Sequence, residues 1–173
     1  VNASLSSGTA SGGSGSDSFS GIEHLIGSEN ADTLLGDGNA NSLSGAGGND
    51  TLNGGLGNDL LIGGAGADVF RFDTLPDALS NRDQISDFNV ADDTIELENA
   101  VFASLASTGV LAAASFRSGA GISAAADAND YLIYDTTSGA LYYDDAGSGG
   151  AAAVPIALLA PGLALTALDF WVT

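Results

Sequence analysis

The sequence predicts an all-β fold: a parallel β-roll of nonapeptide repeats, followed by a mixed, mainly β capping region. Three observations predict it. Glycine recurs every nine residues from Gly27 to Gly63, an aspartate or asparagine follows at the sixth position of each repeat, and a large apolar residue occupies the eighth. With 173 residues, the chain can hold a repeat array and one small further domain. We expect an atypical coil over residues 1–26, the roll over 27–71 and the cap over 72–173.

Five consecutive repeats begin at Gly27. They read GSENADTLL, GDGNANSLS, GAGGNDTLN, GGLGNDLLI and GGAGADVFR. The sixth position holds, in order, Asp32, Asn41, Asp50, Asp59 and Asp68. The eighth position holds Leu34, Leu43, Leu52, Leu61 and Phe70. A period of nine excludes collagen, which needs glycine at every third residue, and this much glycine would cost an α-helix about 0.8–1.0 kcal/mol per residue.

The nine residues divide into a six-residue turn and a three-residue strand. Successive side chains of a strand point to opposite faces, so the eighth position enters a shared core while its neighbours face solvent. Two repeats complete one 18-residue coil. Because a single coil cannot bury its leucines alone, we expect stacked coils that form two short parallel sheets with a leucine ladder between them.

Charge and glycine together indicate a bound cation. The chain has 22 acidic residues against three arginines and no lysine, a formal net charge of −19. Such a chain repels nucleic acid and anionic membranes, and self-repulsion destabilises its compact state. A divalent cation would compensate; a merely solvated acidic protein is the alternative. Glycines let the turn curl until several carbonyls face one point beside the carboxylate. About six oxygens without nitrogen or sulfur suit Ca²⁺ rather than zinc.

The last three repeats resemble the RTX (repeats-in-toxin) calcium-binding consensus G-G-x-G-x-D-x-U-x. This resemblance implies sites between turns two repeats apart. The first turn of each pair gives the carbonyls of positions 2 and 4 and the carboxylate of position 6. The second gives the carbonyls of positions 1 and 3 and another carboxylate. The resemblance therefore implies several Ca²⁺ ions, about three to four.

Carried onto this sequence, the pattern implies four ligand sets. The first is Ser28, Asn30, Asp32, Gly45, Gly47 and Asp50. The second is Asp37, Asn39, Asn41, Gly54, Leu56 and Asp59; asparagine in place of aspartate removes one charge there and predicts weaker binding. The third is Ala46, Gly48, Asp50, Gly63, Ala65 and Asp68. The fourth takes Gly55, Gly57 and Asp59, with residues 72–77 completing it through Asp77.

Two further acidic segments have open interpretations. Residues 12–20 (GGSGSDSFS) match the consensus but lie out of phase, so they form either an extra turn or a chance match in a glycine- and serine-rich stretch. We expect an atypical N-terminal coil there. In the cap, Asp83, Asp87, Asp92 and Asp93 either bind another ion or form a solvated loop.

The segment after the roll resembles the region that closes the roll in serralysin-type C-terminal domains. The similar pieces are Asp83-x-Ile85-x-Asp87-Phe88 and the acidic-apolar run that follows. A repeat array needs a terminal unit that covers its last coil. The residues expected to form this apolar plug are Phe70, Phe72, Ile85, Phe88 and Ile95.

Two local structures are predicted further on. Residues 131–135 and 140–150 (ALYYDDAGSGG) form a hairpin with a glycine turn at Gly139. Residues 99–107 are compatible with a short helix.

The C-terminal tail is apolar but interrupted. Pro155, Pro161, Gly162 and Asp169 break the apolar run and no lysine or arginine flanks it, so we expect no stable membrane span. The ending Asp169-Phe170-Trp171-Val172-Thr173 resembles the uncleaved C-terminal signal of type I secretion substrates. A last buried strand is the alternative, and the two are compatible.

The resemblance implies a calcium-binding module that folds outside the cell and supports type I secretion and stability of a larger exported protein. Its partners would be calcium, the type I secretion apparatus and an upstream domain, with a secreted, extracellular or cell-surface location. Alternatives are the C-terminal part of a secreted enzyme (serralysin-type protease, lipase or polysaccharide-modifying enzyme) or of a surface adhesin or S-layer protein. With His24 as the only histidine, no cysteine and neither H-E-x-x-H nor G-x-S-x-G, we expect no catalytic site in this chain.

Overall fold

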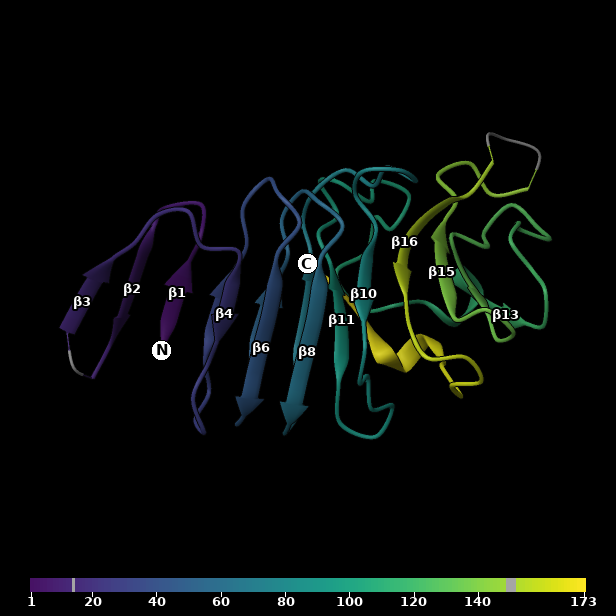
Figure 1. Cartoon of the computed structure of the whole chain (residues 1–173). Helices are drawn as coiled ribbons and strands as arrows, with labels where there is room; N and C mark the ends of the chain where they lie inside the picture. Colours follow the sequence, from purple (N-terminus) through teal and green to yellow (C-terminus); the bar gives the residue numbers. More distant parts are fainter. Residues whose placement is uncertain (14, 149–151) are drawn as a thin grey trace.

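The computed structural model describes residues 1–13, 15–148 and 152–173, and two sheets run along its length (Figure 1). The nine-stranded sheet contains, in spatial order, β12 (Gly109–Val110), β17 (Phe170–Val172), β11 (Thr94–Leu97), β9 (Val69–Phe72), β7 (Thr51–Asn53), β5 (Thr33–Leu35), β1 (Asn2–Ser4), β2 (Thr9–Gly12) and β3 (Gly15–Ser18). The eight-stranded sheet contains β13 (Phe116–Gly119), β14 (Leu132–Asp135), β15 (Ala140–Tyr143), β16 (Val154–Leu158), β10 (Asp83–Ile85), β8 (Leu60–Ala65), β6 (Ser42–Gly47) and β4 (His24–Ile26). Within the described ranges the helices are two short 3-10 segments, η1 (Ala113–Ser115) and η2 (Ala167–Asp169). The predicted all-β class is confirmed.

The nonapeptides form the predicted parallel roll. The chain alternates between the two sheets, so that β5, β7 and β9 pair in parallel in one and β4, β6 and β8 pair in parallel in the other. The register places eighth-position residues opposite one another, for example Leu43 opposite Leu61. The eighth-position residues with at most 1% exposure are Leu34, Leu43, Leu52, Leu61 and Phe70. They are the core because the strand period of two turns every eighth position inward.

The N-terminal segment departs from the expected coil. β1 adds one strand to the roll, parallel to β5, with Ala3 opposite Leu34. β2 and β3 then extend the sheet as an antiparallel hairpin, with Gly12 opposite Gly15. Most of residues 12–20 therefore belong to this hairpin and make no turn of the roll, while Ser14 lies outside the described residues. The match to the consensus is misleading there because its glycines form a hairpin end.

The roll continues into the cap for one more strand on each sheet. β10 pairs in parallel with β8, and Ile85 lies opposite Leu61. β11 pairs in parallel with β9, and Ile95 lies opposite Phe70. The expected plug residues Phe70, Phe72, Ile85, Phe88 and Ile95 are all buried, as predicted.

Strands from the end of the chain complete the cap. β17 pairs with β11 and β16 with β10, both in parallel. The predicted hairpin of β14 and β15 is confirmed, and Gly139 adopts φ +81° at its turn. The predicted end of this segment includes residues 149 and 150, which lie outside the described residues.

The short helix compatible with residues 99–107 is not formed. The segment makes isolated turns in which the N–H groups of Val101 and Phe102 both donate to the Glu98 carbonyl. Phe102 is fully buried and packs edge-on against Tyr143, with ring centroids 5.0 Å apart. Packing against the cap sheet thus replaces a regular helix.

The C-terminal tail ends inside the nine-stranded sheet. Phe170 and Val172 are each 1% exposed, so the prediction of a last buried strand is confirmed. Among the described residues, no helix has the length and apolar character needed to cross a membrane.

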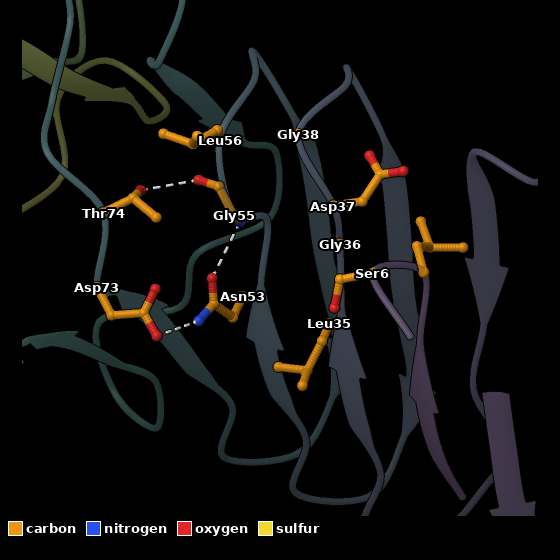
Figure 2. Close-up of a pocket in the computed structure, with 11 residues that line it drawn as sticks. Ser6, Leu35, Gly36, Asp37, Gly38, Asn53, Gly55, Leu56, Asp73 and Thr74 are labelled. Carbon is orange, nitrogen blue, oxygen red and sulfur yellow. Dashed lines mark hydrogen bonds between the residues drawn. The ribbon is translucent and has the colours of Figure 1, made fainter. Parts of the chain in front are cut away.

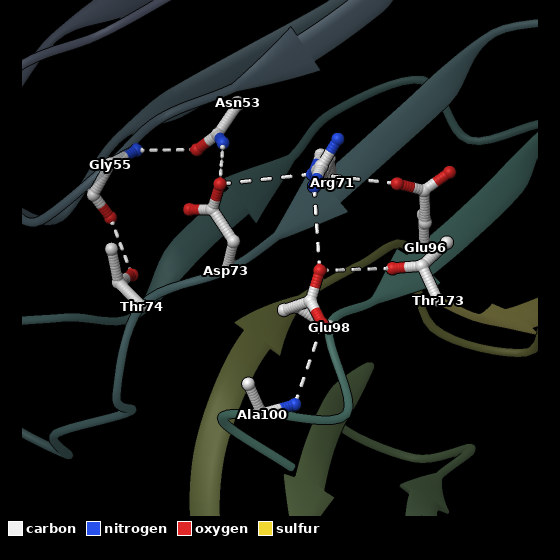
Figure 3. Close-up of polar contacts among 9 residues, drawn as sticks. All are labelled: Asn53, Gly55, Arg71, Asp73, Thr74, Glu96, Glu98, Ala100 and Thr173. Carbon is white, nitrogen blue, oxygen red and sulfur yellow. Dashed lines mark hydrogen bonds and ion pairs between the residues drawn. The ribbon is translucent and has the colours of Figure 1, made fainter. Parts of the chain in front are cut away.

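A polar network ties this last strand to the roll (Figure 3). The Arg71 guanidinium at the end of β9 lies 3.4 Å from Glu96, 3.5 Å from Glu98 and 3.7 Å from Asp73. The Thr173 hydroxyl donates to the same Glu98 carboxylate at 3.4 Å. One cation thereby joins β9, β11 and the C-terminal residue.

Candidate calcium-binding turns

The glycine-rich turns are stacked along two edges of the roll. We number them turn 1 (27–32), turn 2 (36–41), turn 3 (45–50), turn 4 (54–59) and turn 5 (63–68). Turns 1, 3 and 5 lie along one edge and turns 2 and 4 along the other, because corresponding residues of stacked turns are 18 apart. Each gap between stacked turns is a place where two turns can present oxygens to one ion.

The sixth-position side chains join these stacked turns. The N–H of Asp32 donates to Oδ1 of Asp50 at 2.8 Å, and the N–H of Asn41 donates to Oδ1 of Asp59 at 2.7 Å. The N–H of Asp50 donates to Oδ1 of Asp68 at 2.9 Å. Each of these buried carboxylates therefore uses one oxygen to hold the preceding turn of its stack.

The turns are of two kinds. In turns 3 to 5, the residues at positions 2 and 4 have positive φ: Ala46 (76°), Gly48 (107°), Gly55 (89°), Gly57 (128°), Gly64 (99°) and Gly66 (139°). Turns 1 and 2 have Ser, Asp or Asn at these positions, and the sixth side chain closes its own turn instead. Asp32 accepts the N–H of Ser28, and Asn41 accepts that of Asp37. The second carboxylate oxygen is thus occupied in turn 1 and left free in turns 3 to 5.

Three buried carboxylate oxygens consequently lack a partner. Among the described residues, Oδ2 of Asp50, Asp59 and Asp68 is buried without any hydrogen bond. The three aspartates are only 1–2% exposed. An unpaired buried carboxylate is strongly unfavourable, so binding of a cation or a proton at these oxygens would stabilise the folded roll.

Carbonyl oxygens face the same gaps. A β-carbon placed on Gly64 would collide with the carbonyl of Ala46, and one on Gly66 with the carbonyl of Gly48. A β-carbon on Gly45 would meet both Oδ2 of Asp50 and the carbonyl of Gly63. The space between turns 3 and 5 is therefore lined by oxygens from both turns.

The second edge repeats this arrangement. A β-carbon on Gly55 would collide with the carbonyl of Asp37, and one on Gly57 with that of Asn39. One on Gly36 would meet the carbonyl of Gly54 and the side-chain oxygen of Asn41.

The structure stacks the pairs of turns that contain the first three predicted ligand sets, and coordination by each residue of these sets stays a prediction. Each set contains one carbonyl that also accepts a main-chain N–H: Ser28 from Gly47 at 3.1 Å, Asp37 from Leu56 at 3.1 Å, and Ala65 from Gly48 at 2.9 Å. A carbonyl has a second lone pair, so these bonds leave it able to coordinate.

The fourth predicted set needs a correction at Asp77. Its carboxylate accepts the N–H groups of Leu79 and Ser80 at 3.0 and 2.9 Å and so folds its own loop. The sixth position of the next turn is taken by Asp83, whose Oδ1 accepts the N–H of Asp59 at 3.1 Å. The spacing is 24 residues instead of 18 because the connecting loop is longer than a nonapeptide.

The sequence contained a signal for the role of Asp83. Asp83-Gln84-Ile85 and Asp93-Thr94-Ile95 repeat the aspartate-x-apolar ending of the nonapeptides, although the glycines are gone. Asp93 accordingly takes the sixth position of the last turn, and its Oδ1 accepts the N–H of Asp68 at 3.0 Å.

The 73–82 loop covers turn 4 in place of another nonapeptide (Figure 2). The Thr74 hydroxyl donates to the Gly55 carbonyl at 2.8 Å, and Asn81 accepts the N–H of Gly57 at 3.2 Å. Asn53 links Gly55 to Asp73. An open groove of about 590 Å³ lies alongside, between this loop and the N-terminal segment. The Gly55 carbonyl thus already accepts a hydrogen bond from the loop.

Burial raises the pKa values of the clustered carboxyls. It raises the pKa of Asp59 to about 6 and, together with the negative charge of Asp59, that of Asp83 to about 8. Burial likewise raises the pKa of Asp50, Asp68 and Asp93. These shifts arise because burial removes water from the carboxylates and because neighbouring carboxylates repel one another.

The donor set favours calcium. Among the described residues, no three His, Cys, Asp or Glu side chains converge on one point, so main-chain oxygens must supply much of any coordination sphere. An oxygen-only set with at most two carboxylates per gap is the chemistry of a hard cation such as Ca²⁺.

Comparison with known proteins agrees with this chemistry. A family model described as RTX calcium-binding nonapeptide repeat (4 copies) matches residues 17–52 and 44–74. Residues 17–74 match RTX calcium-binding repeats. RTX repeats bind Ca²⁺, and turns 1 to 5 all lie within this match. The cap beyond residue 74 lies outside this match, and its likeness to serralysin-type domains stays a prediction.

One solved structure is similar over most of the chain. It is the solution structure of the AlgE6R3 subunit from the Azotobacter vinelandii mannuronan C5-epimerase, with 27% sequence identity and a TM-score of 0.49. The alignment covers 85% of this chain and 76% of that one. No curated protein matches the chain.

Proposed function

We propose that this RTX chain is the calcium-folded module of a larger exported protein, and that it folds on Ca²⁺ outside the cell and supports type I secretion and stability of that protein. The observation that carries the proposal is the set of buried, unpartnered Oδ2 atoms of Asp50, Asp59 and Asp68. They make the folded roll unfavourable until a cation occupies the gaps.

Calcium concentration would then control folding. Without the ion, a chain with a net charge of −19 and buried carboxylates cannot offset the entropy of ordering its glycines. Extracellular calcium modules typically bind at about 10⁻⁴–10⁻³ M, so the cytosol would leave the chain unfolded and the medium would fold it. An ion that binds only the folded state stabilises it by mass action.

The C-terminal strand supports export of an unfolded chain. Phe170 and Val172 are buried between β11 and β12, so a receptor that reads these apolar side chains has to meet them before the roll folds. We propose that the type I apparatus reads the segment from Asp169 in that state. The location outside the cell follows from this order of events.

We further propose that the chain itself is not an enzyme and that any catalysis belongs to an upstream domain. A secreted enzyme and a surface adhesin both remain compatible with a calcium-folded module at this position. The residues that precede the module in the longer protein discriminate between them.

The test is far-UV circular dichroism during a Ca²⁺ titration of EDTA-treated protein, with Mg²⁺ as the control ion. We expect a cooperative gain of β signal with Ca²⁺ and none with Mg²⁺ at the same concentration. A fully folded spectrum in EDTA would remove the basis for export in a disordered state.

A further inference from the structure

The last turn of the roll stacks on a cap loop instead of another nonapeptide. Residues 86–93 connect β10 to β11 beneath turn 5, and β11 pairs in parallel with β9. The N–H of Asp68 donates to Oδ1 of Asp93, as the N–H of Asp50 does to Asp68 one coil earlier. The carboxylate ladder of this edge therefore extends into the cap, beyond the RTX match that ends at residue 74.

The unpartnered oxygen of Asp68 lies beside Gly63, the residue whose N–H donates to Asp87 of this loop. In the gap between turns 3 and 5, a β-carbon on Gly45 would meet Oδ2 of Asp50 and the carbonyl of Gly63. One coil on, a β-carbon on Gly63 would meet Oδ2 of Asp68 in the same way, but no carbonyl of the next turn is among its nearest atoms.

Asp87 stands where that next turn would be. Its two carboxylate oxygens accept the N–H groups of Gly63 at 3.0 Å and Gly64 at 2.9 Å. A carboxylate thus lies against the first two residues of turn 5, on the side of the gap that a further nonapeptide would otherwise occupy.

We propose that turn 5 and the cap loop form a further Ca²⁺ site, with the free Oδ2 of Asp68 as the carboxylate ligand from the roll and Asp87 as the carboxylate ligand from the cap, while Asp93 holds turn 5 in place through the N–H groups that it accepts. The repeat geometry adds the carbonyls of Gly64 and Gly66, which correspond to those of Ala46 and Gly48 one coil earlier. The proposal rests on the calcium-binding function of the roll and extends it to a cap loop that contains no consensus repeat.

Both proposed carboxylate ligands have the capacity to coordinate. A carboxylate offers about four lone-pair positions, and Asp87 uses two for main-chain N–H groups. Oδ2 of Asp68 is buried and free of any hydrogen bond. Burial raises the pKa of Asp68 and of Asp93, and the negative charge of Asp87 raises both further, which places the three groups within electrostatic reach of one another.

The first test counts bound ions on the whole chain by equilibrium dialysis against Ca²⁺ with metal analysis. We expect Asp87→Asn to bind one ion fewer per chain than the wild type. Asp92→Asn is the matched control, because Asp92 is exposed in the same loop and accepts only the side-chain amide of Asn89. An unchanged ion count in Asp87→Asn would overturn the site, whereas a wild type that binds no Ca²⁺ would overturn the proposed function as well.

A second measurement does not depend on the variant folding. Anomalous scattering from crystals of the unaltered chain soaked with a lanthanide locates the ions directly. A peak at about 2.3–2.6 Å from Oδ2 of Asp68 and beside Asp87 is the expected result. Peaks confined to the gaps between turns 1 and 3, 2 and 4, and 3 and 5 would refute the cap site while supporting the roll.

Discussion

The main-chain N–H of Asp50 donates to Oδ1 of Asp68, 2.9 Å away and one coil further along the roll. This bond leaves Oδ2 of Asp68 buried and unpartnered. A single carboxylate therefore has two separate tasks, since one oxygen sets the spacing of stacked turns and the other is available to an ion. The same division holds for Asp50 and Asp59, which explains how sites of uniform geometry arise from a repeat with one acidic residue.

Of the predicted ligands, Asp59 is the one whose replacement should shift the calcium midpoint of folding most. It contributes to the gap between turns 2 and 4 and to the gap between turn 4 and Asp83. We expect Asp59→Ala to raise the calcium midpoint of folding by about tenfold, because charge count strongly tunes calcium affinity. Asn41→Ala removes a neutral ligand from one gap only and should shift the midpoint less. Circular dichroism titrations compare the two, and equal shifts would contradict the ligand assignment.

Ala46 is the one non-glycine residue with positive φ among the described residues, at 76°. The left-handed region costs a residue with a β-carbon about 1–2 kcal/mol, and glycine loses about 0.5–1 kcal/mol through its flexibility. Ala46→Gly should therefore raise the free energy of unfolding by about 0.5–1 kcal/mol.

The matched control is Ala65→Gly, the same change at a position in β8 without positive φ. It should lower the free energy of unfolding by about 0.5–1 kcal/mol. Urea unfolding at saturating Ca²⁺ measures both changes. Shifts of the same sign would show that the backbone of Ala46 carries no strain.

Without calcium, the roll should gain stability as the pH falls. The pKa of Asp59 is raised to about 6 and that of Asp83 to about 8, whereas both lie near 3.8 in the unfolded chain. Above pH 8 both groups are ionised in both states, and the folded state carries the full cost of burying them. As the pH falls through 8 and then 6, the folded state takes up protons that the unfolded chain does not, so its stability rises until about pH 4.

Far-UV circular dichroism in EDTA between pH 8.5 and 4.5, roughly the span of these shifts, checks this direction through the fraction of chain that is folded, which should rise as the pH falls. Asp83→Asn should flatten the upper part of the profile because its amide does not titrate. A folded fraction of the wild type that decreases steadily as the pH falls over the same range would refute the prediction.

Arg71 should hold the C-terminal strand on the roll. Its three contacts with carboxylates are partly exposed, so each is worth only about 0.2–1 kcal/mol, and we expect Arg71→Gln to lower the free energy of unfolding by about 1 kcal/mol. Trp171, the only tryptophan, lies in β17 opposite Glu96 and reports on this strand by fluorescence. Arg82→Gln removes the same charge from an exposed side chain and should leave the signal unchanged.

Periodicity alone determined the roll. Glycine at position 1, aspartate at position 6 and leucine at position 8 predict the turn, the ladder and the core because each depends only on the repeat and on its copies at a fixed spacing. The resemblance to RTX repeats implied the first three ligand sets, and the structure stacks their turns because the 18-residue period is kept. The prediction that Asp77 takes the sixth position of the next turn was wrong, because it assumed a nonapeptide spacing that the 72–82 segment does not keep.

Tertiary structure decided what lies beyond the repeats. Asp83 and Asp93 reach the ladder only because β10 and β11 pair with β8 and β9, and no local rule sets the length of the loops before them. Residues 12–20 match the consensus but contribute to a hairpin, because β1 already pairs with β5 at the position where the next strand of the roll would lie. A repeat determines structure through contacts with its own copies, whereas a cap is determined by the surface that it has to cover.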